Sequence, residues 1–181
     1  MRIAITGGIA EGKSTVLGYL QDLGYQTDSA DLMAKKVFAE PEVQQQIGQD
    51  FALETPISTE ALRAEILRDP DKRRQLNSLM HPLVHEQMMN SQATFIEVPL
   101  LFEACIYGLF DQVWVVTCGS EEQRRRLVER YGSEDQAEAM LAAQLSSRAK
   151  TAFSDRVLRT NQPPETVSRL LSEAMAALNG P

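Results

Sequence analysis

The stretch "ITGGIAEGKSTVLGYL", residues 5–20, decides the fold of this chain. Its residues 7–14 match the pattern G-x-x-x-x-G-K-[S/T], which forms a phosphate-binding loop when a buried strand precedes it and a helix follows it. Both flanks are present. The apolar run 2–6 is typical of a strand buried on both faces, and residues 13–23 have a helical pattern that ends at Gly24.

The residue types of this loop explain how it would hold a nucleotide. Glycines let successive N–H groups converge on one phosphate chain, and the helix that begins near Lys13 adds its positive end. The Lys13 ammonium would reach the β and γ oxygens, and the Ser14 hydroxyl would take a Mg²⁺ position. A glycine-rich turn can also serve packing alone, but the Lys-Ser pair and both flanks favour a nucleotide. The predicted ATP-binding residues of the loop are Gly7, Gly8, Ile9, Ala10, Glu11, Gly12, Lys13, Ser14 and Thr15.

Apolar runs and helical patterns alternate along the rest of the chain. Strands separated by helices predict a three-layer α/β fold with a five-stranded parallel sheet and right-handed crossovers. Residues 40–93 are instead polar and helical, and the C-terminal residues 179–181 are expected to be a frayed end. The predicted strands are 2–6, 25–28, 93–99, 112–118 and 155–161; the predicted helices are 13–23, 30–39, 120–132, 134–153 and 164–178; and the prolines taken as boundaries are Pro41, Pro56, Pro70 and Pro82.

The composition narrows the class of protein. A chain of 181 residues that is 43% hydrophobic and 24% charged is typical of one globular domain. Its net charge of −7 argues against a long nucleic acid as partner. No signal peptide and no run of about 18 apolar residues is visible, so we expect a cytoplasmic protein without a membrane partner. Cys105 and Cys118 lie in apolar surroundings and are predicted to be two reduced core thiols.

An acid follows the second predicted strand, in the stretch "TDSADLMAKKVF" of residues 27–38. Because strand ends of a parallel sheet meet at the edge that carries the phosphate loop, Asp31 is a candidate to accept or orient the proton of an acceptor hydroxyl. The alternative is an acid that opens a helix and favours its dipole. Asp28 and Ser29 are better placed as helix caps, which leaves Asp31 available for chemistry.

Beyond the loop, the sequence resembles the dephospho-coenzyme A (dephospho-CoA) kinase family, which phosphorylates the ribose 3′-hydroxyl in the last step of coenzyme A synthesis. The His-Pro and Pro-Leu-Leu-Phe-Glu segments, joined to Gln-x-x-x-Arg, are more selective than the phosphate loop alone. The matching stretches cover nearly the whole chain in the family's order: "TGGIAEGKST", "DSADLMAKKV", "MHPLV", "EVPLLFE", "EEQRRRLVER", "AAQLSSRAK" and "SDRVLRTN".

The resemblance implies a P-loop kinase domain that uses MgATP and dephospho-CoA. We expect the protein to be a monomer or a weak homo-oligomer. Its core would be residues 1–39, 93–120 and 152–181, with an acceptor-binding helical insertion at about 40–92 and a lid at about 121–151. Asp31 would be the general base, and Glu97 would hold Mg²⁺ through water together with Ser14. The residues expected on the acceptor side are His81, Pro99, Leu100, Leu101, Glu103 and Gln144.

The resemblance also assigns charged residues to the lid. Three consecutive arginines, residues 124–126, cannot share one helix face, so we select Arg130, one turn beyond Arg126, as the lid arginine. A solvated basic face beside Glu121, Glu122 and Glu129 explains Arg124 and Arg125 equally well. Gln144 and Arg148 fall four apart on one predicted helix face that would point into the active site, and Asn161 would touch adenine.

His81-Pro82 would start the helix below the acceptor side. For His81, a hydrogen bond to backbone at the helix start is favoured over a catalytic role. His85 lies one turn on, and two such histidines could bind a metal, but no third ligand is spaced nearby.

The chain departs from the family pattern at several positions. Ser29 replaces an acid, Ala10-Glu11 replaces Gly-Ser, and Thr59 stands where arginine is usual. The Glu11 side chain can point to solvent, but its charge beside the phosphates would weaken nucleotide affinity. These changes concern rate and affinity more than reaction class. Two alternatives stay open: a kinase for another small acceptor, such as a nucleoside or nucleoside monophosphate, and a non-catalytic nucleotide-binding protein.

Overall fold

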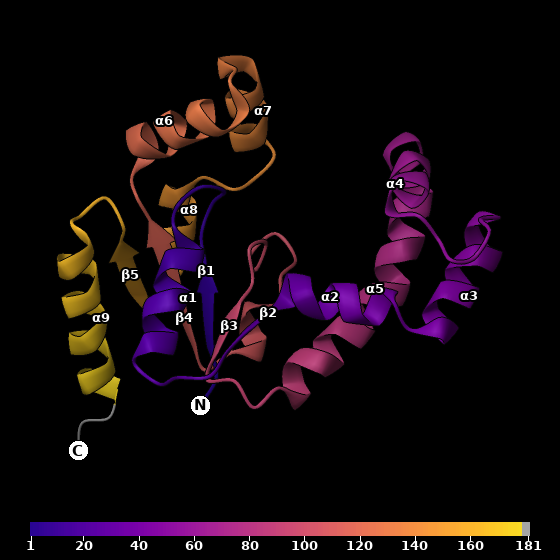
Figure 1. Cartoon of the computed structure of the whole chain (residues 1–181). Coiled ribbons are helices and arrows are strands. Elements are labelled where there is room, and N and C mark those ends of the chain that lie inside the picture. Colours follow the sequence, from indigo (N-terminus) through magenta and orange to yellow (C-terminus); the bar gives the residue numbers. More distant parts are fainter. Residues whose placement is uncertain (179–181) are drawn as a thin grey trace. The chain divides into compact units, whose positions relative to one another are not determined.

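The computed structural model describes residues 1–178, so the expected frayed end at 179–181 lies outside the described residues. A five-stranded sheet has the order β2-β3-β1-β4-β5, and every neighbouring pair is parallel (Figure 1). The predicted parallel α/β sheet is therefore confirmed. The strands are β1 (Ile3–Thr6), β2 (Thr27–Ser29), β3 (Phe95–Glu97), β4 (Gln112–Thr117) and β5 (Arg156–Arg159).

The chain divides into two compact units. Unit 1 comprises Met1–Ser29 and the described chain from Gln92 on, and unit 2 is Ala30–Ser91. The helix that follows β2, expected in the core, thus belongs to unit 2. Unit 1 contains α1 (Lys13–Asp22), the 3-10 helix η1 (Tyr107–Leu109), α6 (Ser120–Tyr131), α7 (Glu134–Ala142), α8 (Ser147–Thr151) and α9 (Pro164–Leu178); unit 2 contains α2 (Ala30–Phe38), α3 (Pro41–Phe51), α4 (Thr59–Arg68) and α5 (Pro70–Asn90).

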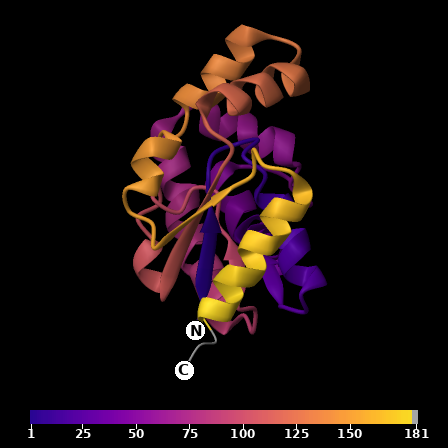
Figure 2. The ribbon, with the colours of Figure 1, turned by 90° about the vertical axis from the view of Figure 1, so that its left-hand side faces the viewer.

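The central strand β1 of unit 1 is buried along its whole length, which shows that the sheet is covered on both faces. Side chains of β1, β4 and β5 form one apolar cluster with α1 and α9, including Ile5, Trp114 and Leu171. Helix α8 contacts β4, and Figure 2 shows α8 and α9 on opposite sides of β5. These three layers place the carboxyl ends of β1, β3 and β4 at one edge, where the loops carry the site.

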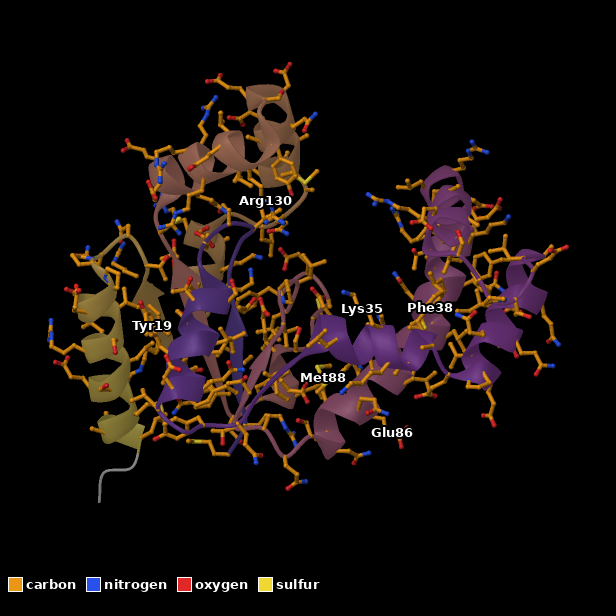
Figure 3. The ribbon with its side chains drawn as sticks, in the orientation of Figure 1. Tyr19, Lys35, Phe38, Glu86, Met88 and Arg130 are labelled. Carbon is orange, nitrogen blue, oxygen red and sulfur yellow. The ribbon has the colours of Figure 1, made fainter. Side chains whose placement is uncertain are left out.

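Unit 2 has its own apolar core. It includes Val43, Ile47 and Phe51 from α3 and Leu62 from α4, together with partly buried residues on both sides of Pro82 in α5. Helix α5 also contacts α2, and Figure 3 labels Phe38 on α2 and Met88 on α5.

The prediction that His81-Pro82 starts a helix is wrong. Pro82 lies inside α5, a helix of 21 residues that begins at Pro70. A proline inside a helix costs about 3 kcal/mol. Leu76, Leu79 and Met80 before it, and Leu83 and Val84 after it, pack against the same core, and this packing keeps the helix continuous.

Three further expectations are corrected. The predicted helix 134–153 is two helices, because Ser146 caps the start of α8 by accepting a hydrogen bond from the Ala149 N–H. Gln144 and Arg148 are consequently not on one helix. Cys118 is buried as expected, but Cys105 is exposed and is not a core thiol.

Within the described part of the chain, none of the helices combines the length and the apolar character needed to span a bilayer.

Candidate active site

The phosphate loop joins β1 to α1 and needs its glycines. Gly12 precedes the helix in a left-handed conformation with φ of 88°, which glycine adopts without strain. At Gly8, an added Cβ would clash with the Gln123 side chain and lie 2.9 Å from the Glu11 carboxylate. The backbone can therefore pass this close to two polar side chains only because residue 8 has no side chain of its own.

The positive groups of the loop gather at the start of α1. Lys13 Nζ donates to the Gly8 carbonyl oxygen at 3.0 Å and to the Gly7 carbonyl oxygen at 3.3 Å. Ser14 and Thr15 are exposed in the first turn of the helix. The first N–H groups of a helix have no partners inside it, so this end attracts anions. The arrangement suits the phosphates of a nucleotide.

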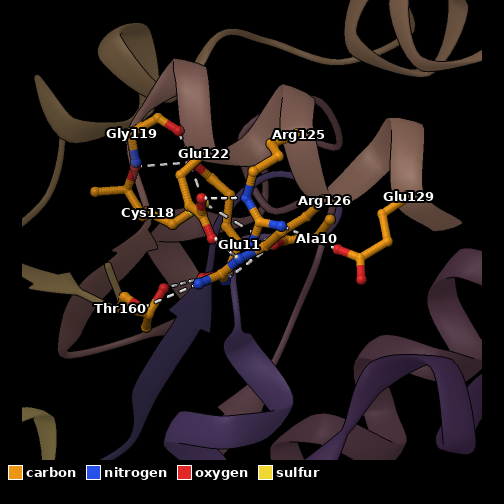
Figure 4. Close-up of polar contacts among 10 residues, drawn as sticks. Ala10, Glu11, Cys118, Gly119, Glu122, Arg125, Arg126, Glu129 and Thr160 are labelled. Carbon is orange, nitrogen blue, oxygen red and sulfur yellow. Dashed lines mark hydrogen bonds and ion pairs between the residues drawn. The ribbon is translucent and has the colours of Figure 1, made fainter. Parts of the chain in front are cut away.

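The carbonyl oxygens of the loop are held from α6 and from the chain after β5. Gln123 Nε2 donates to the Ile9 carbonyl at 2.9 Å. Arg126 donates to the Ala10 carbonyl at 3.4 Å and to the Thr160 carbonyl at 3.1 Å (Figure 4). These bonds tie the loop to two other elements of unit 1.

Glu11 points into the protein, so the expectation that it can point to solvent is wrong. Its side chain is fully buried, with 0% of its surface exposed. The carboxylate accepts hydrogen bonds from the Gly8 N–H, from Thr117 Oγ1 at 2.8 Å and from Ser147 Oγ at 2.6 Å. These donors satisfy the buried carboxylate, and they lie in parts of the sequence that no local pattern connects.

The arginines of α6 point in different directions, as predicted. Arg124 pairs with Glu134 and Glu138 of α7, whereas Arg126 turns toward the phosphate loop. Arg125 pairs with Glu122 and Glu129, which fits the expected solvated face. Hydrogen bonds from Arg125 and then Arg126 lower the pKa of Glu122 to about 2.

Arg130, the predicted lid arginine, is exposed on α6, where its guanidinium lies 5.5 Å from the centre of the Tyr131 ring (Figure 3). Asn161, predicted to touch adenine, is exposed and directly follows Thr160, whose hydroxyl donates to the Glu11 carbonyl at 2.6 Å. Both residues lie in unit 1, which also contains the phosphate loop.

A buried lysine in α8 was not predicted. Lys150 has no exposed surface, and its ammonium lies 2.9 Å from Glu103 Oε1 and 3.4 Å from the Pro99 carbonyl oxygen. Glu103 also accepts from the Leu145 N–H at 2.9 Å. Burial raises the pKa of Glu103, but the hydrogen bonds from Lys150 and the backbone outweigh it, so the net pKa is below the ordinary value.

The loop after β3, expected on the acceptor side, is thereby anchored to α8. Of its members, Leu101 is buried and Leu100 is exposed. The sequence contained one signal for Lys150, its position at the end of the stretch "AAQLSSRAK". The other residues missed from the sequence, Thr117, Gln123, Ser147 and Thr160, have ordinary polar side chains whose contacts become visible only in the fold.

Arg148 and Gln144 line a cavity of about 600 Å³ in unit 1. Residues two apart on a helix face different ways, so Arg148 points into this cavity while Lys150 is buried against the Pro99 loop. Gln144 Oε1 accepts a hydrogen bond from the Ile9 N–H at 3.1 Å, which places it on the phosphate loop. Other residues of the cavity wall are Thr117, Gly119, Ser120, Gln123, Leu141, Leu145, Ser146, Ser147, Thr151, Val157 and Arg159.

The residues predicted to hold Mg²⁺ lie in unit 1. Glu97 ends β3, and its Cα is paired with that of Ile5, the neighbour of the last β1 residue. Ser14 lies in the first turn of α1. A carboxylate and a hydroxyl are oxygen ligands of the kind that Mg²⁺ prefers, so this donor set fits the ion.

Asp31 and His81 both lie in unit 2. Asp31 is exposed in the first turn of α2, two residues after β2 ends, so a helix-dipole role and a catalytic role both remain compatible with its position. His81 lies in the middle of α5 and its ring stacks on that of His85, with 5.9 Å between ring centres. Burial and then the neighbouring His81 lower the pKa of His85.

Comparisons with known proteins match most or nearly all of the chain. The sequence profile of the dephospho-CoA kinase family matches residues 1–165. A dephospho-CoA kinase of Shouchella clausii (strain KSM-K16) is 34% identical over 192 aligned positions, which cover 97% of this chain and 98% of that relative. The structure of TT1252 from Thermus thermophilus has a TM-score of 0.83 at 29% identity and covers 99% of this chain and 98% of its own. A dephospho-CoA kinase from Campylobacter jejuni shares the fold at 23% identity, with a TM-score of 0.64 and coverage of 97% and 96%.

Proposed function

The chain belongs to the dephospho-CoA kinase family, and we propose that it transfers the γ-phosphoryl group of ATP to the ribose 3′-hydroxyl of dephospho-CoA. One observation carries this proposal: the phosphate loop, with Lys13 at the start of α1, occurs in a chain that matches the family along most of its length. The chain is an ATP-dependent kinase of the P-loop fold. A kinase for another small acceptor, or a non-catalytic nucleotide-binding protein, is not favoured.

On the donor side, the loop amides and Lys13 would hold the phosphates, and Asn161 would contact adenine. Charge builds up on the oxygens of the transferred group, and cations stabilise it there. Arg130 and Arg148 would supply those cations. Both side chains are exposed, and neither guanidinium forms an ion pair with another described residue. Both are therefore available to bind phosphate oxygens, which supports this role.

On the acceptor side, Asp31 would accept the proton of the 3′-hydroxyl. The hydroxyl oxygen forms a bond to the γ-phosphorus as the bond from that phosphorus to the β,γ-bridging oxygen breaks, and ADP leaves. His81, Gln144 and the loop from Pro99 to Glu103 would position dephospho-CoA. The anchoring of Glu103 by Lys150 supports a fixed geometry for that loop.

Ser14 and Glu97 are the residues that would hold Mg²⁺, Glu97 through water. When bound, the ion supplies charge neutralisation on the phosphate oxygens. The Ser14 hydroxyl would orient toward the phosphates from the first turn of α1, and the Glu97 carboxylate would do so from the end of β3.

We further propose that the protein works in the cytoplasm as a monomer or weak homo-oligomer. Neither Cys105 nor Cys118 forms a disulfide, as is usual in a reducing compartment. Size-exclusion chromatography with light scattering over a range of concentrations tests the oligomeric state, and a stable dimer or larger assembly would contradict it.

The experiment that tests the function is ADP release with MgATP and a panel of acceptors: dephospho-CoA, adenosine, AMP and shikimate. We expect release to depend on dephospho-CoA and to stay near the acceptor-free rate with the others. Release stimulated by another acceptor alone would identify a different kinase. ATP binding without release on any acceptor would instead identify a non-catalytic protein.

A further inference from the structure

We infer that Glu11 is a positioning residue that joins the phosphate loop to β4 and to α8 through one buried carboxylate. The loop itself is tied by the Gly8 N–H, which donates to Glu11 Oε2. The other oxygen, Oε1, accepts from the hydroxyls of Thr117, the last residue of β4, and Ser147, the first residue of α8. Glu11 is thus one point at which three elements of unit 1 meet.

The carboxylate suits this place chemically. A carboxylate has two oxygens with about four lone-pair positions and can accept all of these hydrogen bonds at once. With 0% of its surface exposed, Glu11 depends on them, and it forms no ion pair with another described residue. An apolar side chain would leave the buried Gly8 N–H without this partner, which is the costly half of a lost hydrogen bond.

The hydrogen bonds that the Glu11 carboxylate accepts from Gly8, Thr117 and Ser147, which we call the clamp, have a direct consequence for the loop. Gly8 lies at the loop's entry, and its carbonyl oxygen accepts from Lys13 Nζ at 3.0 Å. Ile9, the next residue, is held by Gln123 and Gln144. The hydrogen bond from the Gly8 N–H to Glu11 therefore fixes the residue whose carbonyl oxygen accepts from Lys13.

The clamp has a second consequence for the lid. Ser147 immediately precedes Arg148 in the sequence, and Lys150 lies about one helical turn after Ser147. Because Ser147 donates to Glu11 at 2.6 Å, the start of α8 is coupled to the loop that holds the phosphates. Glu11 thus acts through the position of Lys13 and of α8, and does not itself reach the transferred group.

A variant series tests this inference, which for turnover rests on the proposed kinase reaction and for nucleotide affinity does not. The variants are Glu11→Ala, Glu11→Gln, Ser147→Ala and the double variant Glu11→Ala/Ser147→Ala. Ser146→Ala is the matched control, because it removes the neighbouring hydroxyl that caps α8 and does not touch Glu11. For each protein, ATP affinity is measured by calorimetry, kcat and KM with dephospho-CoA by ADP release, and folding by thermal melting.

We expect Glu11→Ala to weaken ATP binding by about tenfold or more, since a buried donor of the loop loses its partner. Ser147→Ala should lower kcat by about tenfold and change ATP affinity less than twofold, because only the link to α8 is lost. Ser146→Ala should change melting without this split between kcat and affinity. Glu11→Gln should stay close to wild type, since its amide oxygen can accept from Gly8 and its amide nitrogen can donate to the two hydroxyls.

The double variant gives the sharpest readout. If Ser147 acts through Glu11, removing both should lower kcat no further than Glu11→Ala alone. Effects that add, or a Ser147→Ala variant that behaves like Ser146→Ala, would overturn the inference. If Glu11→Ala fails to fold, the contrast between Ser147→Ala and Ser146→Ala still decides it, because only Ser147 donates to Glu11. If dephospho-CoA is no substrate, the ATP affinities of the Glu11 variants still test the clamp.

Discussion

The ammonium of Lys150, which has no exposed surface, lies 2.9 Å from the Glu103 carboxylate and joins α8 to the loop after β3. A buried cation needs a partner, and removing one member of such a pair is more costly than the pair is worth. This contact therefore matters for the fold as well as for the site, because the same loop is expected to meet the acceptor.

Glu103→Gln should lower the free energy of unfolding at pH 7 by about 3 kcal/mol, since it leaves Lys150 buried without its anion. The pKa of Glu103 is below its ordinary value of 4.5. Its contribution is therefore complete above pH 4.5 and is lost as the pH falls through its folded-state value. Urea unfolding of both proteins between pH 7 and pH 3 should show the difference shrinking below pH 4.5; a gap that is independent of pH would contradict this account.

Gly8→Ala should disrupt the phosphate loop, because the new Cβ would meet Gln123 and lie 2.9 Å from the Glu11 carboxylate. We expect ATP affinity to fall by about tenfold or more, as when a well-packed site is displaced by a fraction of an ångström. Gly18→Ala on α1 is the matched control, since nothing lies within 4 Å of its added Cβ and alanine favours a helix by up to about 1 kcal/mol. Equal ATP affinity of the two variants would count against the described loop geometry.

Asp31→Asn separates the two interpretations of this acid. If Asp31 accepts the acceptor proton, turnover should fall by about a hundredfold or more while calorimetry shows unchanged ATP binding. If Asp31 only favours the helix dipole, the variant should lose no more than about 1 kcal/mol of stability and keep its turnover. Glu42→Gln in the first turn of α3 is the control for the dipole effect alone. Turnover retained by both variants would remove Asp31 from the mechanism.

Lys13→Ala should abolish acceptor-dependent ADP release, to below about a hundredth of the wild-type rate, because the loop loses the cation aimed at the phosphates. The fold should persist, since Lys13 Nζ donates to loop carbonyl oxygens and Lys13 is not a member of the buried apolar cluster of unit 1. Lys72→Ala, which removes an ion pair with Glu65 in unit 2, is the comparison variant. A Lys13→Ala protein with wild-type turnover would contradict the site.

The sheet and the phosphate loop could be predicted from sequence because both depend on local signals. The apolar run before Gly7, the Gly-Lys-Ser spacing and the helix up to Gly24 lie within one short stretch. Helical geometry alone also predicts that the arginines 124–126 cannot all share one face, and Arg124 and Arg126 do point in different directions.

Other features depend on contacts between distant residues and could not be predicted. The direction of Glu11 is set by Thr117 and Ser147, which lie 106 and 136 residues away along the chain. The burial of Lys150 depends on Glu103, which belongs to another loop. The local sequence predicts a helix boundary at Pro82, because proline disfavours the interior of a helix, and only the packing of both flanks of α5 overrides that preference.

The most direct test of the central claim is to incubate the protein with MgATP and dephospho-CoA and to identify the product by mass spectrometry and ³¹P NMR. The account predicts coenzyme A, with one added phosphoryl group on the ribose 3′-hydroxyl, formed in equal amount to ADP. Dephospho-CoA recovered unchanged, while ATP is bound or hydrolysed to ADP and phosphate, would contradict it.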